Sequence, residues 1–241
     1  MKYFLSIILV SLALNIYSQK PEETEDWSRK PALVTPGSGT KPPSDAIILY
    51  NSAGDISKWE SVKGGPVQWK AGNELTVVPK SGAIKTKQSF GNVQLHVEWK
   101  TPEAVSGEGQ GRGNSGIFLM GLYEVQVLDS YNNETYYNGQ AASIYKQQIP
   151  LVNASLGPGE WQTYDIFFTA PVFDSGKNLK TPGYITVVHN GVLAQDHVEI
   201  KGETAFIGKP KIRYHSDKLP LMLQEHSNPV SFRNIWIREV K

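Results

Sequence analysis

The chain has 241 residues, of which 24 are basic and 23 acidic, so its formal net charge is +1. This balance gives no electrostatic reason to expect a nucleic acid or an anionic membrane surface as partner. Cysteine is absent, which excludes disulfides, thiolate catalysis and cysteine-ligated zinc. The length suffices for one large domain, and 22 glycines and 15 prolines are typical of a turn-rich β protein.

Residues 1–18 have the pattern of a secretory signal peptide. Lys2 precedes an apolar run over residues 3–14, and small or polar residues follow at Ser18 and Gln19. We therefore expect cleavage near Ser18 and Gln19 and a mature protein in the periplasm or outside the cell. An uncleaved anchor helix is the alternative, although the run is short for a bilayer and no later segment is apolar enough to span one. Without a cysteine after the run, a lipid-anchored lipoprotein is excluded.

Residues 19–44 are rich in proline, glycine and charge and show no hydrophobic period, so they are predicted to be an extended leader or linker. Trp27 could anchor this leader to the body of the protein. From residue 45 to residue 241, short segments of alternating polarity follow one another without an internal repeat. We therefore expect one domain over residues 45–241.

Short strands dominate this domain, and pairs of turn residues separate them. The predicted strands are residues 46–50, 74–78, 93–99, 115–120, 123–129, 161–170, 184–190, 219–226 and 232–240. Asn190 and Gly191 predict a tight hairpin between YITVVH (184–189) and VLAQDHVEI (192–200), because both residues tolerate positive φ. No segment has a sustained helical period. Many short strands at nearly even spacing indicate a single all-β sandwich or jelly roll.

Three of the predicted strands carry polar residues on one face, because side chains at i and i+2 point the same way. These residues are Gln94, His96 and Glu98 in the first strand, Glu124 and Gln126 in the second, and Gln224 and His226 in the third. A face open to water would explain them. Such faces usually carry lysine and threonine, however, whereas here the side chains are amides, imidazoles and carboxylates. They predict a polar groove in a curved sheet.

Several blocks of the sequence are similar to a known family. VQLHVEWKTP, GRGNSGIFLMGLYEVQVLDS, SIYK, NGVL and LQEHSNPVSFRNIWIREV resemble, in order and spacing, the 3-keto-disaccharide hydrolase domain family. The likeness runs from about Asp45 to Lys241. It implies a concanavalin A-like jelly roll, which is an all-β sandwich of two antiparallel sheets in one domain. It also implies a small carbohydrate substrate, a glycoside whose sugar ring carries a ketone at carbon 3.

The chemistry of such a substrate differs from ordinary glycoside hydrolysis. Retaining β-glucanases of this fold use a Glu-x-Asp-x-Glu strand with paired carboxylates, whereas this chain has Gln126 at the middle position. In a 3-keto sugar, the C2 proton is α to the ketone and the glycosidic oxygen is β to it. A general base can remove that proton, the leaving group departs by elimination, and water adds to the enone. Donors that stabilise the enolate are needed, but a nucleophilic carboxylate is not.

Two residues are candidates for acid–base catalysis. His226 is the favoured base, because an imidazole titrates near neutral pH. The alternative for His226 is a structural histidine beside a turn, bonded through Ser227 or Asn228. Glu124 could be base or acid in a partly desolvated groove, or it could form a cross-strand ion pair with a residue such as Arg233.

Other polar residues are candidates for binding the sugar. Gln126 and Gln224 could bind hydroxyl groups through their amides, unless they are only exposed residues of a wet face. In the glycine-rich loop GEGQGRGNSG, Arg112 could clamp a hydroxyl or polarise the ketone, or it could be a solvated charge. Asn114 could orient this loop rather than touch substrate. The remaining candidates are His96, Glu98 and Asp129, the last of which could instead cap the turn that follows it.

The sequence indicates no certain cofactor and gives only weak support for a divalent metal such as Ca²⁺. The five histidines show no HExxH or paired spacing. His96, Glu98, Glu124 and His226 could still meet in space and form a histidine–carboxylate site. A structural Ca²⁺ held by loop aspartates and carbonyl oxygens could also occur in this fold.

Two other classes of function remain open at the level of sequence. A carbohydrate-binding module of the same fold would use aromatic platforms such as Trp69, Tyr131, Tyr136 and Tyr137. A structural role in an envelope assembly is the third class. The enzyme hypothesis is favoured because a pure binding module needs aromatic residues where this chain has Glu124 and His226.

Overall fold

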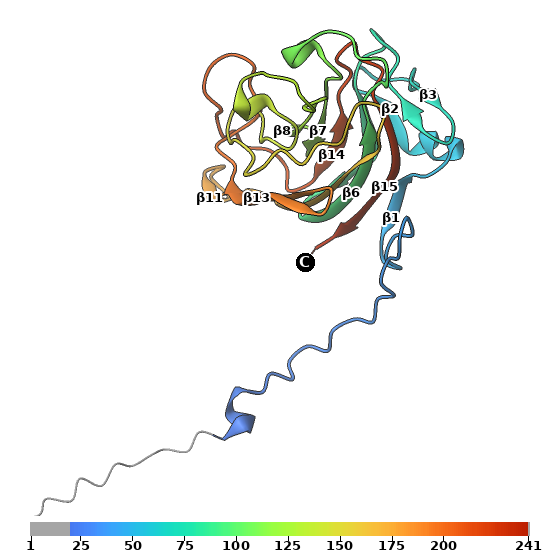
Figure 1. Ribbon diagram of the computed structural model, residues 1–241. Coiled ribbons are helices and arrows are strands. Elements are labelled where there is room, and N and C mark those ends of the chain that lie inside the picture. The colour runs from blue at the N-terminus through green and yellow to red at the C-terminus, as the bar shows by residue number, and fades with distance from the viewer. Residues whose placement is uncertain (1–19, 241) are drawn as a thin grey trace, which may run out of the picture. The chain divides into compact units, whose positions relative to one another are not determined.

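Two antiparallel β-sheets pack face to face in the computed structural model, which describes residues 20–240 (Figure 1). One sheet has eight strands and the other has five. The larger sheet curves around the smaller one, so that the chain forms a jelly-roll sandwich. The all-β fold class predicted from the sequence is confirmed.

The bounds of the elements are as follows. The larger sheet contains β1 (Ile47–Tyr50), β3 (Lys70–Ala71), β4 (Leu75–Thr76), β6 (Val93–Lys100), β9 (Gln162–Thr169), β12 (Tyr184–His189), β13 (Val192–Glu199) and β15 (Ser231–Glu239). The smaller sheet contains β2 (Trp59–Ser61), β5 (Ile84–Phe90), β7 (Ser115–Leu119), β8 (Tyr123–Val127) and β14 (Leu219–Leu223). A separate hairpin is formed by β10 (Val172–Phe173) and β11 (Leu179–Thr181), and the 3₁₀ helices are η1 (Pro21–Thr24), η2 (Ala53–Lys58), η3 (Gly109–Gly111) and η4 (Tyr137–Gly139).

The strand order separates segments that are neighbours in sequence. The larger sheet runs β13-β12-β9-β6-β15-β4-β3, with β1 also paired to β15, and the smaller runs β2-β5-β14-β7-β8. Consecutive strands β6 and β7 therefore belong to different sheets. The sequence located most of these strands but missed β2, β3, β5, β10 and β11. Four of these have only two or three residues, and β5 carries two lysines and a glutamine that interrupt its apolar pattern.

The predicted hairpin at Asn190 and Gly191 is confirmed. Both residues have positive φ, 50° and 79° respectively. His189 pairs with Val192 across the turn, so Asn190 and Gly191 form the two-residue loop between β12 and β13. This is the turn geometry that matches the right-handed twist of two adjacent strands.

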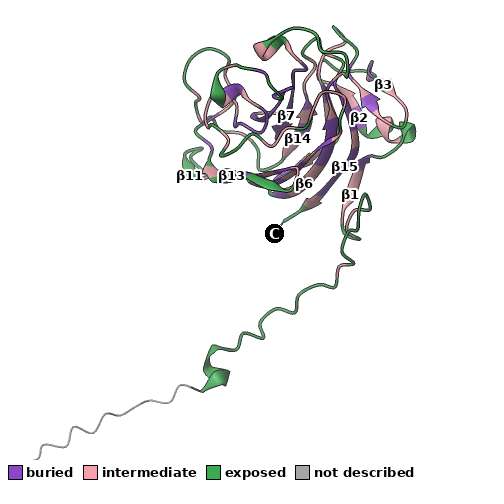
Figure 2. Ribbon diagram, in the orientation of Figure 1, coloured by how far each residue is buried: buried purple, intermediate pink, exposed green. Residues whose placement is uncertain are grey.

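The core lies between the two sheets, and strand alternation decides which side chains enter it (Figure 2). On β6, Val93, Leu95, Val97 and Trp99 are buried in this core. Trp69 is also buried there, packed against the ring of Phe232. Trp69 therefore cannot be the exposed sugar platform that a binding module would require.

Strand β8 ends the smaller sheet but is buried on both faces. Residues 138–148 follow its outer edge and satisfy its backbone groups. Gln126 N donates to Ser143 O at 3.0 Å, and Tyr145 N donates to Glu124 O at 3.2 Å. Covering an edge in this way removes an unpaired row of donors and acceptors, and it also creates a wall beside β8.

The chain divides into two compact units, Met1–Val34 and Thr35–Lys241. In the first unit, the described residues 20–34 form only η1 and extended backbone, and Trp27 is exposed. The predicted signal peptide, residues 1–18, lies outside the described residues. No helix within the described part of the chain is long and apolar enough to cross a membrane.

Candidate active site

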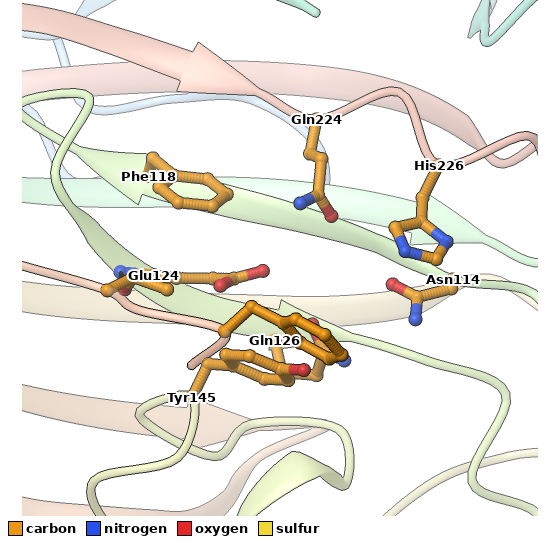
Figure 3. A pocket seen from close by; sticks show the side chains of 9 residues that line it. Asn114, Phe118, Glu124, Gln126, Tyr145, Gln224 and His226 are labelled. Atoms are coloured by element: carbon orange, nitrogen blue, oxygen red, sulfur yellow. Dashed lines mark hydrogen bonds between the residues drawn. The ribbon is translucent and has the colours of Figure 1, made fainter. Parts of the chain in front are cut away.

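A cavity of about 280 Å³ lies against the smaller sheet, on the side away from the core (Figure 3). Tyr123 and Val125 of β8 are in the core, so the alternating Glu124 and Gln126 point the opposite way, into the cavity. The full lining consists of Asn114, Phe118, Glu124, Gln126, Tyr145, Thr204, Phe206, Gln224 and His226.

The floor of the cavity is built by pairing between β7 and β8. Phe118 stands opposite Glu124, and Gly116 stands opposite Gln126. A Cβ at Gly116 would overlap the carboxylate of Glu124 and press on the ring of Phe118. A glycine is thus needed at this position to leave room for the Glu124 side chain.

Strand β14 brings the other predicted residues to the same floor. It pairs with β7, and Gln224 N continues the ladder by donating to Gly116 O at 2.9 Å. The strand ends at Leu223, one residue earlier than Gln224, so Gln224 and His226 lie in the segment that leaves the sheet. Figure 3 shows the Gln224 side chain extending toward the space above Glu124 and the His226 ring beside it, above Asn114. The structure therefore brings the two candidate acid–base residues and the two candidate glutamines together.

Glu124 is the most deeply buried of the ionisable groups in this cavity, with 3% of its surface exposed. Burial raises the pKa of its carboxyl group from 4.5 to about 8, because the charged form loses its hydration. With its nitrogen turned toward Glu124, the Gln126 amide donates to Oε1 at 3.2 Å. Glu124 can thus hold a proton at neutral pH and release it inside the cavity.

Two further polar groups in the cavity lack a partner among the described residues. Gln224 Oε1 is buried and accepts no hydrogen bond. His226 is exposed, and its ring forms no hydrogen bond with Ser227, Asn228 or another described residue. Since buried polar atoms are nearly always paired, the open acceptor of Gln224 is suited to a ligand hydroxyl group.

Arg112 and Asp129 do not line this cavity. The guanidinium Nε of Arg112 donates to Asp129 Oδ2 at 2.7 Å, and its terminal nitrogens donate to the carbonyl groups of Tyr131 and Asn132. Asp129 Oδ1 also accepts from Tyr131 N, which is a turn-capping contact. Together they fix the glycine-rich loop. Asn114, which does line the cavity, donates from its amide to Gln110 O and so also holds the loop.

His96 and Glu98 lie on β6 in the other sheet, so the grouping of these two residues with Glu124 and His226 was wrong. They point away from the core on the larger sheet, because their neighbours Leu95 and Val97 point into it. The alternation of polar and apolar residues predicts which face of a strand a side chain is on, but it does not predict which sheet the strand belongs to.

The residue predicted as the partner of Glu124 in an ion pair also lies on the larger sheet. Arg233 Nε instead donates to Glu98 Oε2 at 2.6 Å, across the β6–β15 pair. Burial alone would raise the pKa of Glu98, but hydrogen bonds from Asn234 and Arg233 lower it. Among the described residues Glu124 forms no ion pair, so no nearby cation offsets the burial that raises its pKa.

Four residues of the lining were not predicted. They are Phe118, Tyr145, Thr204 and Phe206. Phe118 looked like an ordinary strand residue, and Tyr145 follows the strand edge in an irregular segment. Thr204 and Phe206 belong to the long connection between β13 and β14, where no periodic pattern exists to indicate a face.

Within residues 20–240, no group of three or more histidine, aspartate or glutamate side chains is arranged to hold a metal ion. The tyrosines proposed as platforms of a binding module, Tyr131, Tyr136 and Tyr137, are not among the residues that line the cavity. The lining is instead dominated by amides, a carboxyl group and an imidazole. Such a set can bind hydroxyl groups and transfer protons.

Comparison with known proteins agrees with this description. The model of the 3-keto-alpha-glucoside-1,2-lyase-like domain family matches residues 45–238. A Parabacteroides distasonis protein of known structure, provisionally named a glycosyl hydrolase, is 50% identical with a TM-score of 0.87, covering 92% of this chain and 97% of its own.

Two further P. distasonis structures carry the same provisional name. Each is 19% identical, with TM-scores of 0.58 and 0.52, covering 82% and 81% of this chain and 94% and 99% of their own. At this identity they show the shared fold alone. A comparison with curated proteins gives no match.

The burial of Glu124 predicts a pH-dependent stability. Because the carboxyl pKa is raised in the folded state, its contribution is fully present below pH 4.5 and is lost as pH rises through about 8. At pH 9, Glu124→Gln should therefore have a higher free energy of unfolding than the parent, by on the order of a few kcal/mol, and a higher unfolding temperature. At pH 4 the two proteins should unfold at nearly the same temperature. Thermal unfolding at both pH values measures this.

The control for this experiment is Glu134→Gln, which alters an exposed carboxylate. This variant should show the same change in unfolding temperature between pH 4 and pH 9 as the parent. Equal unfolding temperatures of the parent and Glu124→Gln at pH 9 would show that Glu124 is not desolvated.

Proposed function

Because the chain belongs to the 3-keto-alpha-glucoside-1,2-lyase-like domain family and is a carbohydrate-active enzyme, we propose that it cleaves the glycosidic bonds of 3-keto-glycosides, including 3-keto-disaccharides. The proposed route is removal of the C2 proton, elimination of the leaving group, and addition of water. The observation that carries this proposal is the meeting of a buried, protonated carboxyl group and an open imidazole in one cavity.

His226 is assigned as the base of the first step. Its ring takes the C2 proton, and the electron pair of the C–H bond forms an enolate with the C3 ketone. The C1–O bond then breaks and the enone forms. Glu124, which carries a proton at neutral pH, gives that proton to the departing oxygen.

The second step reverses the roles of the two groups. The Glu124 carboxylate removes a proton from water, whose oxygen adds to C1. The ring proton of the exposed His226 exchanges with solvent, and His226 then gives a proton to C2. The products are a 3-keto sugar and the free leaving group, and both residues regain their starting forms. If the enone is released before water adds, the same residues perform a lyase reaction.

The amide side chains supply binding and electrostatic stabilisation. The open acceptor of Gln224 can accept a hydrogen bond from a hydroxyl group, and the amide nitrogen of Gln224 can donate to the C3 oxygen as charge develops there. The Gln126 nitrogen already donates to Glu124 Oε1 and Ser115 O, so Gln126 is assigned to holding Glu124 in place. Arg112 and Asp129 are assigned no direct contact with substrate, because they bind each other.

Oxidation at carbon 3 should be required for turnover, because the C2 proton of an unoxidised sugar is far too weakly acidic for an imidazole to remove. The purified protein should release both sugars from a 3-keto-disaccharide and leave its unoxidised parent intact. His226→Ala should lower kcat by roughly 10²- to 10⁴-fold, the usual contribution of a positioned acid–base group. His197→Ala, which removes another exposed histidine, is the matched control and should retain the parent rate.

Solvent deuterium should also appear at C2 of the product. Equal cleavage of the parent disaccharide without deuterium at C2 would favour ordinary glycosidase chemistry instead. A parent-like rate in His226→Ala would transfer the role of base, most simply to Glu124.

The acid role of Glu124 predicts the alkaline limb of the pH profile. Since the protonated form is active, kcat/KM should fall as pH rises through about 8, approaching tenfold per pH unit above that value. In Glu124→Gln, this limb should disappear along with most of the activity. Steady-state rates between pH 5 and 10 give the measurement, and an unchanged limb in the variant would assign it to another group.

We also propose that the enzyme acts outside the cytoplasm, on the basis of the signal-peptide pattern in residues 1–18. N-terminal sequencing of the protein from its natural host should find a mature chain that begins near Gln19. A chain that still begins at Met1 would contradict signal cleavage.

A further inference from the structure

An exposed aromatic side chain stands at the cavity. Phe206 lines the same space as Glu124, yet 70% of its surface is exposed, whereas Glu124 is almost wholly buried. It belongs to the irregular connection between β13 and β14. Phe206 therefore marks the outer end of the cavity and Glu124 its inner end.

The position of Phe206 is fixed by Lys146, which comes from the segment that covers β8. Lys146 Nζ donates to Phe206 O at 2.7 Å and stands 4.2 Å from the centre of the Phe206 ring. The same ammonium group lies 5.3 Å from the ring of Tyr136 and 5.8 Å from that of Tyr145. Cation–π contacts of this kind hold an aromatic ring in place without burying it.

Phe206 is not needed to attach its connection to the sheet. Thr204 already does so, since its N–H donates to Leu122 O at 2.9 Å and its hydroxyl accepts from Glu124 N at 3.0 Å. Exposure of an apolar phenylalanine ring to water is unfavourable in free energy compared with its burial. Its fixed place at the outer end of a polar cavity thus fits contact with a ligand.

The size of the cavity indicates which part of a ligand makes that contact. At about 280 Å³ it is at the small end of ligand sites, which run from roughly 300 to 1,000 Å³. It suits one sugar ring beside Glu124 and His226, so the group on the other side of the glycosidic bond must lie further out. Phe206 is the aromatic residue that extends from the lining to solvent.

We propose that Phe206 stacks on the leaving group and selects 3-keto-glycosides whose leaving group is a ring with an apolar face. This inference rests on the proposed function. The shared chemistry is a planar or nearly planar apolar face, which either the C–H face of a sugar or an aromatic ring supplies. Small alkyl leaving groups would reach the catalytic residues but would gain nothing from Phe206.

The test compares three substrates that share a 3-keto-glucose ring and differ in the leaving group, which is glucose, phenol or methanol. Phe206→Ala should lower kcat/KM roughly 2- to 12-fold for the glucose or phenol substrate, the usual worth of one aromatic contact. It should leave the methyl substrate within twofold of the parent. The comparison is between parent and variant on each substrate, so the differing reactivity of the leaving groups cancels.

Ile207→Ala is the matched control, because Ile207 is 85% exposed, adjacent in sequence and absent from the cavity lining. It should behave as the parent on all three substrates. Lys146→Met should reproduce the selectivity of Phe206→Ala, since it releases the ring without removing it. Phe206→Tyr should restore the parent preference.

The outcomes separate this inference from the proposed function. Equal losses of kcat/KM on all three substrates, or no loss on any, would overturn the role of Phe206 while the 3-keto reaction stands. A loss confined to the phenol substrate identifies an arene as the stacking group, and a loss confined to the glucose substrate identifies a sugar. If the parent enzyme turns over none of the three substrates, the proposed function itself fails and the inference falls with it.

Discussion

The closing of the edge of β8 is the constraint on which the rest of the site depends. A terminal strand would normally expose one row of backbone groups, but residues 142–145 bond most of this row and the hydroxyl of Thr204 accepts from Glu124 N. Strand alternation directs Glu124 away from the core, yet its side chain is almost wholly shielded from solvent. In the described part of the chain it forms no ion pair, and Arg233, which the sequence suggested as its partner, pairs with Glu98 on the other sheet. Burial without a paired cation raises the pKa of the Glu124 carboxyl group.

This arrangement separates two proton-transfer groups that share one cavity. Glu124 sits on the floor in a setting that favours the neutral acid, while His226 sits in the exposed segment after β14, where charge on the ring remains hydrated. Groups placed in such different surroundings can hold and accept protons at the same pH. Burying a carboxyl group costs folding free energy, so the site is maintained at the expense of stability in neutral solution.

The sequence predicted the fold class, most strands and the polar face of β8, because a period of two is a local property. The strand expected over residues 219–226 ends at Leu223, so Gln224 and His226 reach the cavity from the segment that follows β14 and not by alternation. The grouping of His96 and Glu98 with Glu124 failed because the order of strands between sheets is not a local property. Phe206 could not be predicted, since only contacts between distant irregular segments bring it to the cavity, and the raised pKa of Glu124 depends on a cover whose path leaves no periodic signal.

The same segment that closes the edge of β8 also carries Lys146 at its end. The backbone of this segment bonds to β8 and helps to bury Glu124. The side chain of Lys146 donates to the carbonyl group of Phe206 and contacts its ring. The inner and outer ends of the cavity are thus fixed by one stretch of chain. Loosening this segment would hydrate Glu124 and free Phe206 together, which would weaken proton donation and leaving-group contact at once. The acid role proposed for Glu124 depends on burial and the specificity role proposed for Phe206 depends on exposure, and a single structural element supports both residues.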